Sequence, residues 1–167
     1  LKTVATRFLA NSLATLQAFV EAFPVFLSRP HLTLNNGIDP SGWEPDLSNR
    51  ISGRIGLTAR LSQEKGIERA IEAMAILNTQ TVGADLRIIG EGVDRQRLES
   101  LVVEKGIQDL VHFEGFRENI PSILETCSVF VFTPHFGEGT SLALIEAMLL
   151  ELPCIVMDTP AMTEVVI

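Results

Sequence analysis

The chain has 167 residues, of which 46% are hydrophobic and 20% carry a charge, with a formal net charge of −8. These proportions are those of a globular domain with a core of its own. The acidic balance argues against nonspecific binding to nucleic acid or to anionic membranes. We expect no transmembrane helix and no signal peptide, because no apolar run is long enough and the first residues lack the required pattern. Two isolated cysteines and the lack of zinc-type Cys/His spacing favour a cytoplasmic protein without a metal site.

The first 50 residues show little regular pattern. A helix over 13–23, capped by Asn11 or Ser12, and a short strand at 31–34 are predicted. The remainder of this segment holds prolines and turn residues without periodicity. We therefore expect it to form an interdomain joint or the edge of something larger.

After residue 50 the pattern becomes regular. Apolar strands are predicted at 54–58, 86–89, 111–113, 129–132 and 153–157. Helices are predicted between them, at 67–77, 94–105, 119–126 and 140–150. This alternation implies an α/β fold, a Rossmann-like parallel sheet with helices on both faces. The nearly continuous apolar character of the strands supports burial on both sides.

Three loops follow the carboxyl ends of these predicted strands, at 59–65, 90–93 and 134–139. Ligands of open parallel sheets bind outside this edge, near the point where the strand order reverses. We therefore expect any chemistry to lie among these loops.

Two glutamates flank the start of the last predicted helix. Glu146 is the only charged residue between Gly139 and Leu150, so no ion pair along the helix is available to it. A position at the rim, or a pair with a distant arginine, would explain it without a ligand. However, Gly137 and Gly139 allow a close approach of backbone to ligand, and a helix N-terminus favours anions. Amides beside a carboxylate that can accept from a diol suit a sugar or a nucleoside diphosphate, with Glu138 in the same loop.

The loop at 59–66 carries two cations just before a helix. Arg60 can hold an oxyanion through two hydrogen bonds, and Lys65 adds a mobile point charge. Together they could neutralise a diphosphate as it leaves a sugar. The alternative is a solvated loop in which Glu64 screens both cations.

Two further features are weaker signals. Gly90-Glu91-Gly92 is followed by Arg95 where the dinucleotide fingerprint has its third glycine, so it is a poor NAD signature. It could instead be a tight turn where the backbone nears a ligand. His135 lies in the loop before the last helix and could contact a phosphate or a sugar, although a lone loop histidine is more often incidental.

Five short motifs occur in one order along the chain: Ala59-Arg60-Leu61 with Lys65-Gly66, Ile89-Gly90-Glu91-Gly92, Phe113-Glu114-Gly115, Glu138-Gly139-Thr140 and Glu146-Ala147-Met148. Over residues 54–166, and more loosely over Asn35-Asn36-Gly37-Ile38-Asp39, the chain resembles the C-terminal half of the retaining GT-B glycosyltransferases of the large group-1 (GT4) family. The resemblance implies the donor-binding half of a GT-B fold and a nucleoside diphosphate sugar as donor substrate. It implies no metal or other cofactor.

The same resemblance implies roles for individual residues. The donor diphosphate would be bound by Arg60 and Lys65, and the ribose hydroxyls by Glu146. The base would lie along Phe116 and Arg117. Further substrate contacts are implied for Gly92, His135, Glu138, Gly139, Thr140 and Ser141. Catalysis would involve Glu138, Arg60 and Lys65.

Two residues depart from the family pattern. Ala59 stands where the family usually has glycine, and a side chain this small requires only a slight adjustment. His135 stands where a serine is common, which leaves its role open.

The resemblance also sets the expected domain organisation. Residues 51–167 would be the nucleotide-sugar-binding domain, truncated at its C-terminus, and residues 1–50 the joint with a missing N-terminal domain. That missing domain would bind the acceptor, whether a sugar, a lipid-linked molecule or another compound. We expect a protein of the cytoplasm or of the cytoplasmic face of a membrane, no nucleic-acid partner, and donor binding without sugar transfer by the isolated chain. Two alternatives stay open: an NAD-type oxidoreductase domain and a non-catalytic interaction module that keeps the fold.

Overall fold

The centre of the protein is a parallel sheet of five strands. The computed structural model describes residues 7–80, 83–136 and 138–166. The strands are β3 (Arg54–Thr58), β4 (Asp85–Ile89), β5 (Val111–Gly115), β6 (Val129–Phe132) and β7 (Cys154–Val156). Their spatial order is β5-β4-β3-β6-β7, and every neighbouring pair is parallel. The chain moves outward from β3 to β5 and then crosses back to β6, so the order reverses between β3 and β6.

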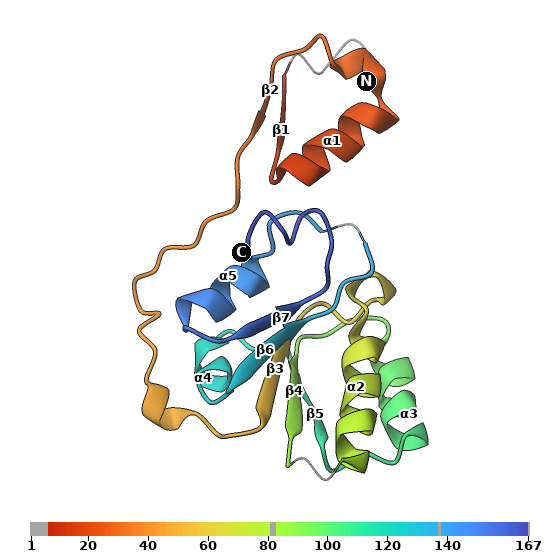
Figure 1. The fold of residues 1–167 in the computed structure, drawn as a ribbon, viewed down its shortest axis with the longest axis vertical. Coiled ribbons are helices and arrows are strands. Elements are labelled where there is room, and N and C mark those ends of the chain that lie inside the picture. The colour runs from red at the N-terminus through yellow and green to blue at the C-terminus, as the bar shows by residue number, and fades with distance from the viewer. Residues whose placement is uncertain (1–6, 81–82, 137, 167) are drawn as a thin grey trace.

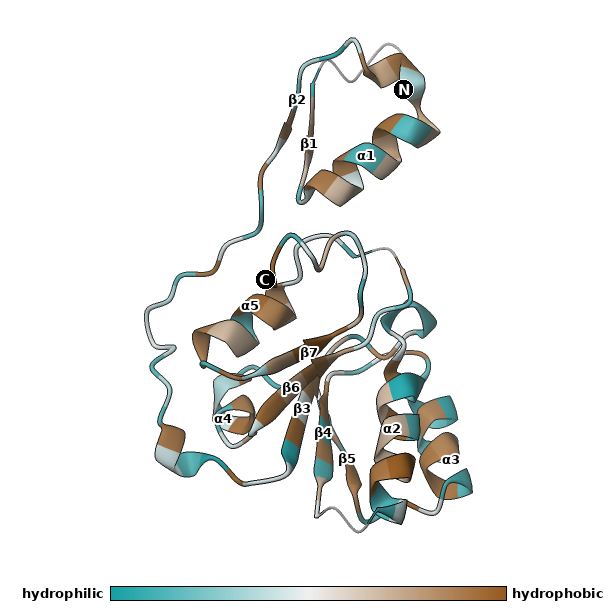
Figure 2. Cartoon of the chain, in the orientation of Figure 1, coloured by the Kyte–Doolittle hydropathy of each residue, from teal (hydrophilic) through white to brown (hydrophobic). Residues whose placement is uncertain are grey.

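Helices cover both faces of this sheet (Figure 1). On one face lie α2 (Ile67–Thr79) and α3 (Arg95–Glu104), and on the other α4 (Pro121–Leu124) and α5 (Leu142–Leu149). Each face has its own hydrophobic cluster. The strands of the sheet are largely hydrophobic along the ribbon (Figure 2). The predicted α/β, Rossmann-like fold is confirmed.

The N-terminal segment forms a small β–α–β unit. Strands β1 (Phe8–Ala10) and β2 (His31–Thr33) pair in parallel and are joined through α1 (Leu13–Ala22) and a short 3-10 helix, Pro24–Phe26. Ser12 caps α1, since its hydroxyl accepts a hydrogen bond from the Thr15 amide. The predicted helix and strand are both present here, but the sequence did not predict that they associate as one unit.

A long connection joins this unit to the sheet and runs beside α5 (Figure 1). Trp43 packs against the hydrophobic cluster that contains α5. The Arg50 guanidinium donates to the carbonyl oxygens of Leu150 and Glu151, at 2.8 and 2.9 Å. These carbonyls lie at the C-terminal end of α5, where a cation complements the helix dipole. The connection therefore fixes this end of the helix.

Most element boundaries differ from the sequence prediction by one or two residues. The short helix expected over 119–126 is a single turn, α4. The last helix begins at Leu142, with Ser141 as its N-cap. No helix in the described ranges is long and apolar enough to span a membrane.

Candidate functional site

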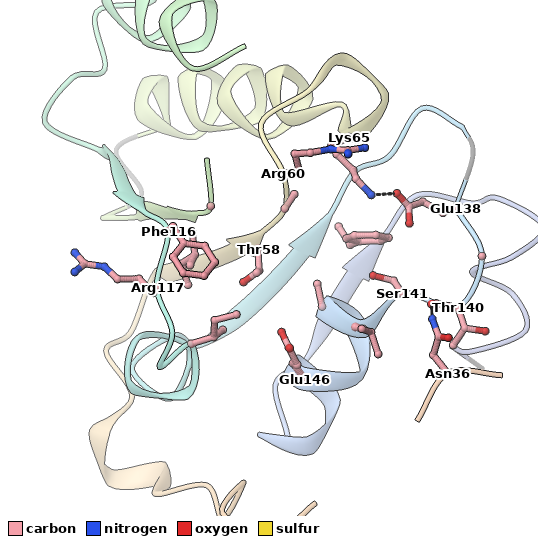
Figure 3. A pocket seen from close by; sticks show the side chains of 18 of the residues that line it. Asn36, Thr58, Arg60, Lys65, Phe116, Arg117, Glu138, Thr140, Ser141 and Glu146 are labelled. Atoms are coloured by element: carbon pink, nitrogen blue, oxygen red, sulfur yellow. Dashed lines mark hydrogen bonds and ion pairs between the residues drawn. The ribbon is translucent and has the colours of Figure 1, made fainter. Parts of the chain in front are cut away.

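A cavity of about 650 Å³ opens at the carboxyl ends of β3 and β6, where the strand order reverses (Figure 3). The predicted site residues that line it are Arg60, Lys65, Phe116, Arg117, Glu138, Gly139, Thr140, Ser141 and Glu146. They come from the loops after β3, β5 and β6 and from α5. The structure therefore brings together side chains that are up to 86 positions apart, from Arg60 to Glu146.

Lys65 and Glu138 form an ion pair across the mouth of this cavity (Figure 3). Their side chains are only 21% and 12% exposed. The two loops meet because of Gly66, which follows Lys65 and adopts a left-handed conformation with φ +59°. A Cβ atom at Gly66 would lie 2.1 Å from the carbonyl oxygen of Thr133, at the start of the other loop. Only glycine permits this approach, and the approach places the ammonium beside the carboxylate.

Arg60 is arranged differently. Its guanidinium pairs with Glu64 at 2.7 Å, and the Arg60 side chain is 70% exposed. Glu64 therefore screens Arg60, as the solvated-loop alternative predicted, but it does not pair with Lys65. An exposed pair of this kind contributes little to stability and can exchange partners at low cost.

The N-terminus of α5 faces the same cavity with free backbone donors. Ser141 is the N-cap, and its side chain makes no capping hydrogen bond. Within the part of the chain that the structure describes, the amides of Leu142 and Ala143 have no acceptor, and both residues line the cavity. Open amides and the helix dipole favour an anion here. Together with Lys65, they form a positively polarised wall.

Glu146 projects into the cavity from the next turn of α5 (Figure 3). Its carboxylate is half-buried and has no hydrogen bond or ion pair among the described residues. Burial raises the pKa of this carboxyl above its ordinary value. No arginine lies beside it in the described ranges, so the structure offers no internal partner for this charge. A pair of hydroxyl donors from a ligand would supply one.

Two predicted substrate contacts do not line this cavity. Gly92 packs against backbone, because a Cβ atom there would lie 2.2 Å from the carbonyl oxygen of Leu61. Its neighbours Gly90 and Glu91 line the cavity instead. His135 bonds through Nε2 to the carboxylate of Glu68 in the first turn of α2. Gly137, which the sequence analysis placed close to the ligand, lies outside the described residues.

A second cavity, of about 530 Å³, lies on the other side of the loop that carries His135. It is bounded by α1 and by the loops after β6 and β7. Glu138 lines both cavities. The Lys65–Glu138 pair therefore lies where the two cavities meet.

Among the residues of the main cavity that were not predicted from the sequence, three carry uncharged polar side chains. Thr58 ends β3, and its hydroxyl is buried and has no hydrogen-bond partner among the residues described. Asn11 and Asn36 reach the cavity from the N-terminal unit. The rule that ligands bind at strand ends could have identified Thr58. Asn11 was expected only as a possible helix cap and Asn36 only as part of a turn, since their contact with the cavity depends on how the unit docks.

The next question is whether the described residues could bind a metal ion. The described residues contain no group of three or more histidine, cysteine, aspartate or glutamate side chains that could hold a metal ion. Both cysteines are free, and burial raises the pKa of the Cys127 thiol to about 11.

Comparison with known proteins identifies the family. A sequence model described as "Glycosyl transferases group 1" matches residues 53–167. The chain belongs to this family. It is 31% identical over 139 residues to the amylovoran biosynthesis glycosyltransferase AmsK of Erwinia amylovora, covering 78% of this chain and 34% of the relative. It is 36% identical over 107 residues to a GDP-mannose-dependent phosphatidylinositol dimannoside mannosyltransferase of Mycobacterium tuberculosis, covering 64% of this chain and 28% of the relative.

Solved structures give the same fold. Anabaena HepE in complex with UDP and glucose superposes with a TM-score of 0.83 at 23% identity, over 98% of this chain and 47% of that one. The chain thus spans about a third or less of the two curated relatives and about half of this structure. The match includes the N-terminal β–α–β unit, because almost all of the chain is covered. The predicted membership of the group-1 family and its GT-B fold are confirmed.

Proposed function

We propose that this chain binds the donor of a retaining glycosyltransferase, which moves a sugar from a nucleoside diphosphate sugar to an acceptor. The observation that supports this most directly is the arrangement of one cavity. Lys65 and the open amides of α5 polarise one part of it, and the unpaired carboxylate of Glu146 projects into another. A nucleoside diphosphate carries matching groups, an anion and a ribose diol. Two of the similar proteins, a GDP-mannose-dependent mannosyltransferase and HepE in complex with UDP, agree with such a donor.

The donor would lie along the cavity in a defined order. Glu146 would accept hydrogen bonds from the ribose hydroxyls, which would compensate the desolvation that raises the pKa of its carboxyl. The base would extend toward Phe116 and Arg117, whose side chains are exposed at the mouth of the cavity. The aromatic ring offers a stacking surface and the guanidinium a polar edge.

The reacting end would lie at the Lys65–Glu138 pair. We propose that the donor phosphates compete with Glu138 for Lys65, which frees the carboxylate of Glu138 to accept from a sugar hydroxyl. The bond between the anomeric carbon and the phosphate oxygen then breaks, and its electron pair leaves with the diphosphate. The acceptor oxygen bonds the anomeric carbon on the same face, and its proton passes to the departing phosphate.

Lys65, Arg60 and the α5 amides would stabilise the charge that develops on the diphosphate. On this proposal neither a metal ion nor another cofactor is required. We place the reaction in the cytoplasm or at the cytoplasmic face of a membrane, where the rest of the full-length protein would bind the acceptor.

The test is thermal unfolding of the chain with UDP, GDP, ADP or NAD. We expect at least one diphosphate to raise the melting temperature and NAD to leave it unchanged, because a ligand bound only by the native state stabilises that state. The variant Lys65→Ala should weaken diphosphate binding by about 1.5–3 kcal/mol, which is typical of a charge-assisted contact, and should leave nucleoside binding unchanged. Stabilisation by NAD alone would favour the oxidoreductase alternative. Stabilisation by none of the four would favour the interaction module.

A further inference from the structure

The two strands of the N-terminal unit end at one short segment of the donor cavity. Because β1 and β2 are parallel, their carboxyl ends lie at the same edge, and an asparagine follows each of them, Asn11 and Asn36. Both residues contact the segment Gly139–Thr140, which precedes α5. These residues are separated from the segment by more than 100 positions, so the contact is tertiary rather than local.

Three contacts make up this junction. The side-chain amide of Asn36 donates to the Thr140 carbonyl oxygen at 2.7 Å (Figure 3). The Thr140 hydroxyl donates to the carbonyl oxygen of Asn11. The Asn11 side chain covers Gly139, because a Cβ atom on that glycine would lie 2.1 Å from Asn11 Oδ1. Thr140 is consequently buried, with 6% of its surface exposed.

The contact from Asn36 bears on where α5 begins. In a helix that began one residue earlier, the carbonyl of Thr140 would accept from the amide four residues on, that of Leu144. Here it accepts from Asn36, and the first carbonyl of the α5 ladder is that of Ser141, which accepts from Ile145. The amides of Leu142 and Ala143 are open as first-turn amides of a helix are, and the bond from Asn36 holds the residue before the N-cap, from which these amides follow.

A second contact, from the segment after β7, holds the start of α1. Glu164, in the turn after β7, accepts from the amides of Leu13 and Ala14 at 2.8 and 2.7 Å. These amides are the open donors at the N-terminus of α1, which a carboxylate satisfies well. The unit is therefore attached through its strand ends and through its helix, and the asparagines are held against Thr140.

We infer that Asn36 is a positioning residue for the diphosphate site, acting through the Thr140 carbonyl on the N-terminus of α5. Asn11 supports it by holding the Thr140 hydroxyl. The inference rests on the proposed function, because it assigns the open amides of α5 to the donor phosphates. It adds that the phosphate site is completed by the N-terminal unit, and not by the Rossmann-like domain alone.

The test compares Asn36→Asp with Asn35→Asp in the full chain. Aspartate keeps the size of asparagine but cannot donate to the Thr140 carbonyl when ionised. Asn35 is adjacent, exposed and without a hydrogen bond in the described ranges, so its variant adds the same charge in the same place. The readouts are affinities for the best-binding diphosphate among UDP, GDP and ADP and for its nucleoside, together with hydrogen exchange of the Leu142 and Ala143 amides.

We expect Asn36→Asp to lower the affinity for the diphosphate about tenfold relative to Asn35→Asp, and to leave the affinity for the nucleoside unchanged. We also expect it to alter the hydrogen-exchange rates of the Leu142 and Ala143 amides. Equal affinities of the two variants, or equal losses for both ligands, would overturn the inference. If the unmodified chain binds none of the diphosphates, the proposed function fails instead. In that case, hydrogen exchange of the Leu142 and Ala143 amides still tests whether Asn36 positions α5. Exchange rates that are the same in Asn36→Asp and in the unmodified chain would refute this role.

Discussion

At the scale of single residues, Glu146 is the most informative side chain. Its carboxylate is half-buried without a partner in the described part of the chain, and burial raises its pKa. A folded-state pKa above the unfolded value means that the folded chain holds more protons between the two values. Stability contributed by this group is therefore greatest below the unfolded pKa, near 4.5, and is lost as the pH rises through the folded pKa. In the absence of ligand, Glu146 destabilises the fold at neutral pH.

The variant Glu146→Gln tests whether the ionised carboxylate destabilises the fold. We expect its unfolding free energy without ligand to equal or exceed that of the unmodified chain at pH 7, and the difference to shrink as the pH falls toward 4.5. Ribonucleotide affinity should fall by roughly 1.5–3 kcal/mol, with a much smaller loss for 2′,3′-dideoxynucleotides. Urea unfolding at several pH values and calorimetric titration provide the measurements. A less stable variant with unchanged ribonucleotide affinity would return Glu146 to a structural role.

At the scale of elements, Gly66 links the 3-10 turn that carries Lys65 to the loop after β6. An alanine there must adopt φ near +59° and must also displace the carbonyl of Thr133. Gly106 is a matched control, because its φ is +66° and no atom lies within 4 Å of a Cβ atom built on it. Gly106→Ala therefore isolates the cost of the left-handed backbone, about 1 kcal/mol or slightly more.

We expect Gly66→Ala to destabilise the chain by about 1–3 kcal/mol more than Gly106→Ala, the range typical of overpacking. It should also weaken diphosphate binding, since Lys65 moves away from the cavity, whereas Gly106→Ala should not. Thermal unfolding and diphosphate titration of both variants test this. Equal effects of the two substitutions on stability and binding would show that the contact with Thr133 does not position Lys65.

Elements also show what could be predicted from the sequence. The five strands were predictable because each is an apolar run buried on both faces, such as Val129–Phe132. The parallel order then placed the loops with Lys65 and Glu138 beside the helix that carries Glu146. The hydrogen bond that Asn36 donates to the Thr140 carbonyl was not predictable, because the two residues are 104 positions apart. The pairing of β1 with β2 was missed for a similar reason, since three-residue strands carry too little pattern.

At the scale of the whole molecule, the roles proposed above for the described residues all concern the donor. The main cavity is lined by the Rossmann-like domain and by the tips of the N-terminal unit. The chain is also acidic overall, with a net charge of −8. Long-range attraction therefore does not favour a phosphorylated donor, and affinity has to come from Lys65 and the α5 amides at short range. These short-range contacts can hold the donor, and none of them is proposed to act on an acceptor.

We therefore expect this chain to bind a sugar nucleotide but not to transfer its sugar. Holding donor and acceptor together in reactive geometry can supply about 7–11 kcal/mol of a barrier, and the residues proposed here position only the donor. A donor cavity open to solvent also weakens the electrostatic effect of Lys65 on the leaving diphosphate. The measurement is product formation with sugar nucleotides and a panel of acceptors, for the chain alone and after addition of the N-terminal half of its full-length parent. Nucleotide binding with slow donor hydrolysis by the chain alone, and transfer after addition, is the expected result. Transfer by the chain alone at about 1 per second or faster, an ordinary enzymatic rate, would show that it holds a complete active site.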